Sequence, residues 1–104
     1  MKNLFAVRTI NYHGTIMVNI CDHELVGTKV KDGELEIKIA KDYFGQQVAG
    51  EEEVSNLLAS CSVANLVGKR IVNKALSMKL ASNLSVRTIS DVPFLMIFKF
   101  QHAY

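Results

Sequence analysis

The amino-acid sequence predicts an α+β fold, in which an antiparallel or mixed β-sheet built from hairpins carries a two-helix segment packed on it. Three observations predict it: two hairpin patterns within the first forty residues, helical spacing of apolar residues after Gly50, and two strand-like runs near the C-terminus. The expected order is four strands, two helices and two strands, which is typical of α+β folds. A chain of 104 residues can bury one core, so we expect residues 1–104 to form a single domain.

Two runs of apolar and β-branched residues, Leu4 to Ile10 and Thr15 to Ile20, predict the first hairpin. The turn cluster between them ends in Gly14, which tolerates a positive φ. Both runs are almost continuously apolar. We therefore expect this hairpin to lie centrally in the sheet, covered on more than one face.

A polar connection over residues 21–27, in which we expect a single helical turn, leads to the second hairpin. Its strands are Thr28 to Lys31 and Glu34 to Ile39, and the Asp32-Gly33 pair between them is favoured in type I′ turns. Apolar and charged residues alternate along the second of these strands. One face of the strand is therefore expected to be buried and the other wet.

The next segment, residues 41–47, is expected to be an irregular link that carries two adjacent aromatic residues, Tyr43 and Phe44. One interpretation is that these rings anchor the link to the core. The alternative is that one of them is exposed and stacks on a nucleic-acid base.

Apolar residues at helical spacing predict the two helices. The first begins with Glu51 to Glu53, which complement the positive end of a helix dipole, and continues to Cys61. A single helix to Leu80 would be unusually long, so we expect a break and a second helix with Ser62 or Asn65 as its N-cap. The apolar face of the second helix is expected to comprise Val67, Ile71, Val72, Ala75 and Met78.

The C-terminal part of the chain predicts two further strands, Leu84 to Ile89 and Val92 to Phe100. Pro93 near the start of the second strand is tolerable because the first residues of a strand need not donate to a neighbour. Residues 101–104 are expected to form a frayed tail.

The charge distribution is uneven along the chain. Residues 54–90 contain five basic residues and no acidic one, whereas residues 1–50 contain six of each. A surface of one sign attracts polyanions even when the net charge is only +2. The alternative is an ordinary solvated surface, because five charges on separate elements need not converge.

The run from Ala64 to Arg70 is the strongest local signal for binding. With Asn65 as an N-cap, free amides near Gly68 and the charges of the following basic residues would suit a phosphate group. The run lacks the further residues of a P-loop, and a plain capped helix is the alternative. The predicted RNA- or phosphate-binding residues are Asn65, Gly68, Lys69, Arg70 and Lys74.

Other chemistry finds little support in the sequence. Two cysteines, Cys21 and Cys61, form no disulfide framework, and together with His23 they make at best an incomplete metal-ligand set. We therefore expect no metal, no cofactor and no catalytic residues. No apolar run is long enough to span a membrane, and we expect a cytoplasmic protein.

Four motifs follow one another along the chain: Cys21-Asp22-His23-Glu24-Leu25-Val26-Gly27, Tyr43-Phe44-Gly45, Ala64-Asn65-Leu66-Val67-Gly68 and Val92-Pro93. In this order and at this spacing they resemble a small archaeal family catalogued as domain of unknown function four-twenty-four. The resemblance covers nearly the whole chain and implies a single-domain protein of an archaeal cytoplasm, with no established activity and at most an RNA or ribosome context. The chain departs from the family at Phe94, where a histidine is usual, and at Lys69, where an acid is common.

These observations favour a non-enzymatic module that binds RNA or a ribonucleoprotein, in a translation-associated context, through a basic helix face. Lys29, Lys31 and Arg87 extend the footprint if the fold brings them alongside. The alternative is a protein-interaction subunit, forming a homodimer or heteromer through apolar surface such as Leu95 to Phe100. A third class is a small metal- or thiol-dependent enzyme using Cys21 and His23.

Overall fold

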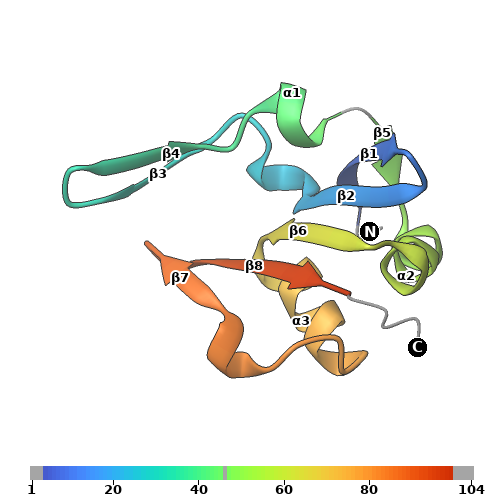
Figure 1. Cartoon of the computed structure of the whole chain (residues 1–104). Coiled ribbons are helices and arrows are strands. Elements are labelled where there is room, and N and C mark those ends of the chain that lie inside the picture. The colour runs from blue at the N-terminus through green and yellow to red at the C-terminus, as the bar shows by residue number, and fades with distance from the viewer. Residues whose placement is uncertain (1–3, 46, 100–104) are drawn as a thin grey trace.

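The computed structural model describes residues 4–45 and 47–99, which form a six-stranded sheet, a separate two-stranded hairpin and three α-helices (Figure 1). The sheet has the strand order β5-β1-β2-β6-β8-β7, and the hairpin is β3-β4. The strands are β1 (Phe5–Tyr12), β2 (Thr15–Asp22), β3 (Lys29–Asp32), β4 (Leu35–Lys38), β5 (Gln47–Ala49), β6 (Val63–Val67), β7 (Arg87–Ile89) and β8 (Val92–Phe98). The α-helices are α1 (Lys41–Phe44), α2 (Glu51–Ser60) and α3 (Lys69–Ser77), with 3₁₀ turns at His23–Leu25 and Asn83–Ser85.

The sheet is mixed, because β2 and β6 run parallel while the other neighbouring strands are antiparallel. The predicted α+β class is therefore confirmed, as are both hairpins and the helical turn after β2. The first hairpin lies in the interior of the sheet, since β5 and β6 flank it.

One face of the sheet is covered by α2 and α3. Alternate residues of the central strands pack there against apolar residues of both helices, among them Leu58 and Ile71, which are fully buried. Because side chains alternate along a strand, the intervening residues face the opposite side. This first core contains most of the buried apolar residues of the described chain.

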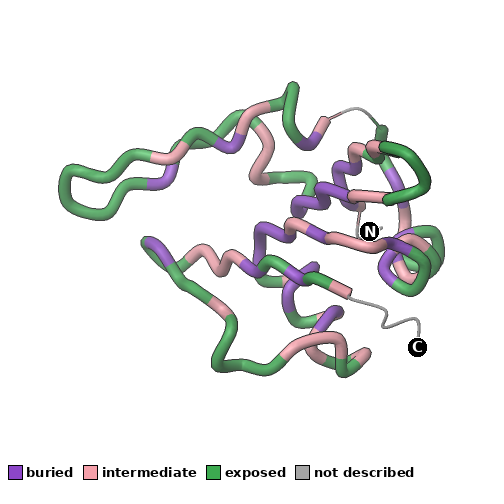
Figure 2. Tube along the Cα trace, viewed as in Figure 1, coloured by how far each residue is buried: buried purple, intermediate pink, exposed green. Residues whose placement is uncertain are grey.

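The opposite face of the sheet is only partly covered. A second core forms where Phe44 of α1 and Ile39, after β4, pack on Ala6, Cys21 and Val67 of the sheet. In Figure 2 the buried residues concentrate in the central strands, whereas the β3-β4 hairpin is mostly exposed. Further along the same face the side chains are more exposed, as at Met96 of β8.

The largest correction concerns residues 62–67, which were expected at the start of the second helix. Residues Val63–Val67 form β6, between β2 and β8 in the middle of the sheet, and α3 begins only at Lys69. A mostly apolar run of five residues does not distinguish a strand from a helix by its spacing alone, so this strand was missed. The link expected over residues 41–47 also contains the short helix α1, and the edge strand β5 begins at its last residue.

The last strand, β8, ends at Phe98, and the described residue Lys99 lies beyond it. The predicted strand residue Phe100 and the predicted tail 101–104 lie outside the described residues. Among the residues that the structure describes, no helix is long and apolar enough to cross a membrane.

Candidate functional site

The predicted phosphate site at the start of α3 is occupied by a side chain of the protein itself. The Asp22 carboxylate accepts hydrogen bonds from the backbone N–H of Arg70 (2.9 Å) and of Ile71 (3.0 Å). Asp22 is buried at the end of β2, and burial raises the pKa of its carboxyl, while the two amides and the Arg70 guanidinium oppose that rise. These two helix amides are therefore already hydrogen-bonded and are not free to bind an external phosphate.

Gly68 is the N-cap of α3, and its backbone has φ 122° and ψ 154°, a conformation that is essentially restricted to glycine. A Cβ atom at this position would lie 2.4 Å from Cγ of Asp22. Gly68 thus permits close approach, as the sequence predicted, but the group that approaches is Asp22.

Most of the predicted basic face is also neutralised. Arg70 donates hydrogen bonds to the Leu4 carbonyl (3.1 Å) and to the Glu24 carboxylate, and its guanidinium lies 4.9 Å from the centre of the Phe5 ring. The hydrogen bond from Arg70 lowers the pKa of Glu24. We call Asp22, Glu24, Gly68 and Arg70 the α3 anchor, since they tie the start of α3 to β2 and to the turn that follows it.

The remaining basic residues differ in their availability. Nζ of Lys74 lies 3.4 Å from Oε1 of Glu51, and the Lys74 side chain is mostly buried. Lys69 is exposed and makes no ion pair within the described chain. Lys29 and Lys31 both pair with Glu36 across the β3-β4 hairpin.

Asn65 does not cap a helix. It lies in β6 and faces the side of the sheet opposite α3, where it pairs in register with Asn19 of β2 and Met96 of β8. It is therefore separated from the other four predicted site residues. The expectation that Asn65 would start the helix was wrong, because Gly68 takes that position.

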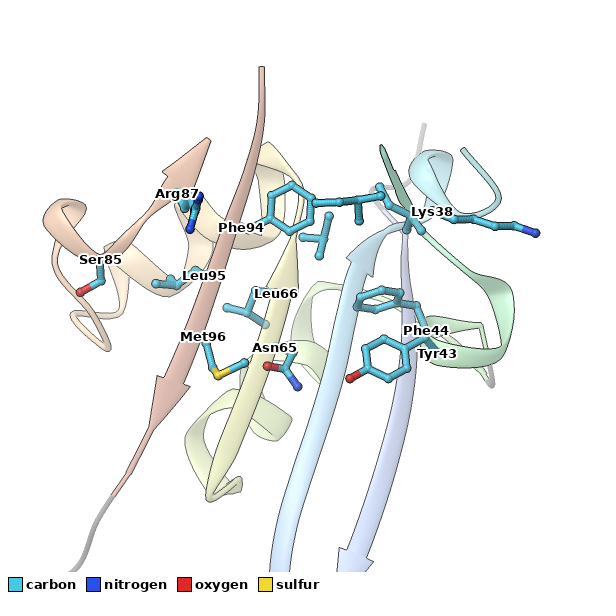
Figure 3. A pocket seen from close by; sticks show the side chains of 13 residues that line it. Lys38, Tyr43, Phe44, Asn65, Leu66, Ser85, Arg87, Phe94, Leu95 and Met96 are labelled. Carbon is cyan, nitrogen blue, oxygen red and sulfur yellow. The ribbon is translucent and has the colours of Figure 1, made fainter. Parts of the chain in front are cut away.

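Asn65 lines a cleft of about 410 Å³ on this second face. The cleft lies between α1 and the end of β4 on one side and β6, β8 and β7 on the other (Figure 3). Its lining residues are Ile37, Lys38, Ile39, Tyr43, Phe44, Asn65, Leu66, Val67, Ser85, Arg87, Phe94, Leu95 and Met96.

The walls of the cleft are mainly apolar and aromatic. Phe44 is buried and anchors α1, whereas the adjacent Tyr43 is 51% exposed, and the two rings meet edge to face with centroids 5.3 Å apart. Figure 3 shows Tyr43 pointing from α1 toward Asn65, with Met96 of β8 on the other side of Asn65. The interpretation that the rings anchor this segment to the core therefore holds for Phe44, whereas Tyr43 is exposed and its stacking on a base stays a prediction.

The charged residues that line the cleft are both basic. Lys38 at the end of β4 and Arg87 at the start of β7 are exposed, and neither forms an ion pair with another described residue. No Asp or Glu is among the thirteen lining residues. Arg87, expected only as an extension of the helix face, thus belongs to this second face.

Asn65 is a polar lining residue of the cleft, and its amide is hydrogen-bonded to that of the buried Asn19. Nδ2 of Asn65 donates to Oδ1 of Asn19 (2.8 Å), and Nδ2 of Asn19 donates to the backbone carbonyl of Tyr43 (3.2 Å). Oδ1 of Asn65 is buried and has no hydrogen-bond partner within the described part of the chain. Buried acceptors in proteins normally have a partner, so this oxygen is an exception that needs an explanation.

The cysteines do not assemble a reactive site. Cys21 belongs to the core beneath α1, whereas Cys61 belongs to the core beneath α2 and α3. Burial, reinforced by the charges of Asp22 and Glu24, raises the pKa of the Cys21 thiol to about 12. In the described residues no three His, Cys, Asp or Glu side chains gather in a way that could hold a metal ion.

Sequence reasoning missed Asn19 as the partner of Asn65, and it missed Lys38, Phe94 and Met96 as residues that line the same cleft. A signal was present for Asn19, because Asn19 and Asn65 each interrupt an otherwise apolar run, and a polar residue inside a central strand needs a partner. The pairing itself depends on β6 lying next to β2, which follows only from the strand order.

The chain is similar to a family of proteins and to a solved structure. Residues 10–100 match the model of the DUF424 family, described as a protein of unknown function. A solved structure, described as an uncharacterized conserved protein from Methanopyrus kandleri, is similar with a TM-score of 0.78 and 12% identity over 97% of each chain, which shows a shared fold. No curated protein matches the chain significantly.

Proposed function

The chain belongs to the DUF424 family of proteins of unknown function, and we propose that it binds single-stranded RNA in the cleft lined by Tyr43, Asn65, Arg87 and Met96. The observation that carries the proposal is the composition of this cleft. Considering residues 4–45 and 47–99, the cleft combines a half-exposed aromatic ring, two cations without ion pairs and an amide oxygen without a hydrogen-bond partner, and no acidic residue lines it.

The apolar walls suit bases rather than the phosphate backbone. Single-stranded RNA exposes the flat faces of its bases, which stack on aromatic side chains. Tyr43 is exposed enough to offer its ring, and Phe44 holds α1 in place by its burial. Met96 adds a polarizable side chain that adapts to a planar ligand.

The two cations suit the phosphates that flank a bound base. Lys38 and Arg87 come from opposite sides of the cleft, so a strand that crosses it would meet one cation on either side. Duplex RNA would not fit this arrangement equally well, because its bases are stacked on each other and their faces are hidden.

The α3 face supports the proposal less well. Arg70 and Lys74 already bind acidic side chains, and Asp22 occupies the helix amides. A phosphate at this position would have to displace a buried carboxylate. The cleft requires no such exchange.

The test measures fluorescence anisotropy of labelled single-stranded RNAs of about eight nucleotides, a length within the range that small single-strand-binding folds cover. The double variant Lys38→Ala/Arg87→Ala is compared with Lys69→Ala/Lys79→Ala, which removes the same charge from the α3 region. We expect the first pair alone to weaken binding and to reduce the salt slope by about 1.4, since each phosphate contact on a single strand contributes about 0.7.

Equal effects of the two double variants would contradict the cleft as the binding surface. Absence of RNA binding to the wild-type protein at low salt would contradict the function itself.

A second candidate function is protein binding through exposed apolar side chains on the same face of the sheet. Large apolar side chains are exposed at Val48 on the edge strand β5 and at Met96 on β8. Analytical ultracentrifugation of the protein distinguishes the two functions. A dimer that the Met96→Asp substitution converts to a monomer, together with indifference to RNA, would favour the second one.

A further inference from the structure

The hydrogen-bonded amides of Asn19 and Asn65 have a fixed orientation. This orientation determines what kind of group Asn65 can recognise in the cleft. Asn19 is only 1% exposed, and Asn65 lies directly opposite it on the neighbouring parallel strand. The two side chains form a relay that begins at the backbone carbonyl of Tyr43.

The direction of the relay follows from the one group in it that cannot rotate. A backbone carbonyl only accepts hydrogen bonds, so the Asn19 amide must present Nδ2 to Tyr43. Oδ1 of Asn19 then faces Asn65, which must present its own Nδ2. Reversing either amide would place two acceptors or two donors against each other, and so Oδ1 of Asn65 is left as the free acceptor.

We propose that Oδ1 of Asn65 accepts a hydrogen bond from a ring or exocyclic N–H group of a base stacked on Tyr43. This inference rests on the proposed function and deepens it. The N–H groups of a base lie in the plane of its ring, so a base stacked on Tyr43 can direct one of them into the floor of the cleft. A buried acceptor without a donor is unfavourable, and the ligand supplies the missing donor.

Access to this oxygen requires a small rearrangement. Asn65 pairs in register with Met96, and Figure 3 shows the Met96 side chain reaching toward it. Met96 is 54% exposed, and a methionine side chain has three rotatable bonds. It can therefore move aside when a base enters, without disturbing β8.

The experiment compares matched oligonucleotides that differ only in the donor. Short uridine, adenosine and cytidine strands are measured against the same strands carrying 3-methyluridine, N6,N6-dimethyladenosine or N4,N4-dimethylcytidine. The added methyl groups leave the stacking face intact but remove the N–H. For the strand that binds most tightly, we expect the methylated form to bind the wild-type protein about ten-fold more weakly, the loss typical of one specific hydrogen bond.

The Asn65→Leu variant provides the matched control. It keeps the size of the side chain but removes the acceptor, so it should bind the methylated and unmethylated strands equally. The central comparison uses only the wild-type protein and does not depend on the folding of this variant.

Each outcome separates this inference from the function on which it rests. If the wild-type protein binds methylated and unmethylated strands equally, the role of Asn65 is wrong and RNA binding stands. If it binds none of the unmodified strands at low salt, both proposals fail.

Discussion

The α3 anchor and the cleft are two polar regions on opposite faces of one sheet, and they differ in how far their polar groups are satisfied. In the anchor, Asp22 accepts from two helix amides, and Arg70 binds both a carbonyl and Glu24. In the cleft, Lys38 and Arg87 make no ion pair within the described chain, and Oδ1 of Asn65 has no donor there. A charge counted in the sequence is therefore not the same as a charge available to a ligand.

The largest effect is expected when the anion of the α3 anchor, Asp22, is removed. The substitution Asp22→Ala leaves the backbone N–H groups of Arg70 and Ile71 without their acceptor and removes the negative charge beside the Arg70 guanidinium. Breaking one partner of a buried charged network costs about 3 to 5 kcal/mol, so we expect the free energy of unfolding to fall by about 4 kcal/mol. Urea denaturation measures it.

Asp42→Ala is the control, because Asp42 is exposed at the start of α1 and the same charge is lost. It should change the unfolding free energy by about 0.5 kcal/mol or less. A similarly small effect of Asp22→Ala would mean that the anchor is not a structural element.

The second prediction concerns Gly68, where the backbone conformation and the close approach of Asp22 both exclude a side chain. We expect Gly68→Ala to destabilise the protein by about 3 kcal/mol, through backbone strain of about 1 to 3 kcal/mol and displacement of the carboxylate. Thermal or urea unfolding measures the change.

The same substitution at Gly50, the N-cap of α2, is the matched control. Its φ is −93°, and no atom lies within 4 Å of the added Cβ. The change in unfolding free energy should be only about 1 kcal/mol, the usual loss at an N-cap. Equal effects at the two glycines would contradict the assignment of Gly68 to a special conformation.

The third prediction concerns the cleft, where a substitution should change RNA affinity more than it changes stability. Tyr43→Ala removes the exposed ring, and base stacking on an aromatic side chain contributes about 1 to 3 kcal/mol. We expect RNA affinity to fall by about ten-fold, with a loss of stability of about 1 kcal/mol from the contact with Phe44.

Tyr12→Ala is the control for this variant, since Tyr12 is 72% exposed and is not among the residues that line the cleft. It should leave RNA affinity unchanged. A loss of affinity in both variants would indicate that RNA contacts exposed tyrosines without using the cleft.

Much of the fold was predictable because its signals are local. The Asp32-Gly33 turn, the alternation along β4 and the acidic start of α2 each depend on a few neighbouring residues. The strand β6 was not predictable, because a run of five mostly apolar residues fits a strand or a helix, and only its pairing with β2 and β8 decides between them.

The candidate site was harder to predict for the same reason. The need for close approach at Gly68 was recognisable from the sequence. The group that approaches is Asp22, which is 46 residues away in the chain and occupies the position that a phosphate would need. Asn65 was singled out as a helix cap, whereas it lies on the other face of the sheet. Long-range pairing therefore decides which polar groups remain available.

The last and smallest effect concerns Glu24, the exposed member of the anchor. Its hydrogen bond to Arg70 lowers its pKa from the ordinary value of 4.5, so the folded state favours the ionised form. The stabilisation is present above pH 4.5 and is lost as the pH falls through the lowered pKa. Asp22 has a raised pKa and acts in the opposite sense, since its contribution to stability declines as the pH rises through that pKa.

We expect Glu24→Gln to lower the free energy of unfolding by about 1 kcal/mol or less at neutral pH, because the Glu24–Arg70 pair is partly exposed. In acid we expect no change, because Glu24 is then protonated in both the folded and the unfolded state. Urea denaturation of the variant and the wild-type protein, from neutral pH to a pH below the lowered pKa of Glu24, measures the difference in unfolding free energy. Glu36→Gln is the control, because Glu36 binds Lys29 and Lys31 on the exposed hairpin without any link to α3. A Glu24→Gln loss that persists undiminished in acid would mean that the Arg70 contact depends on shape rather than charge, and the anchor would then resemble the neutral amide relay of the cleft more than an ion pair.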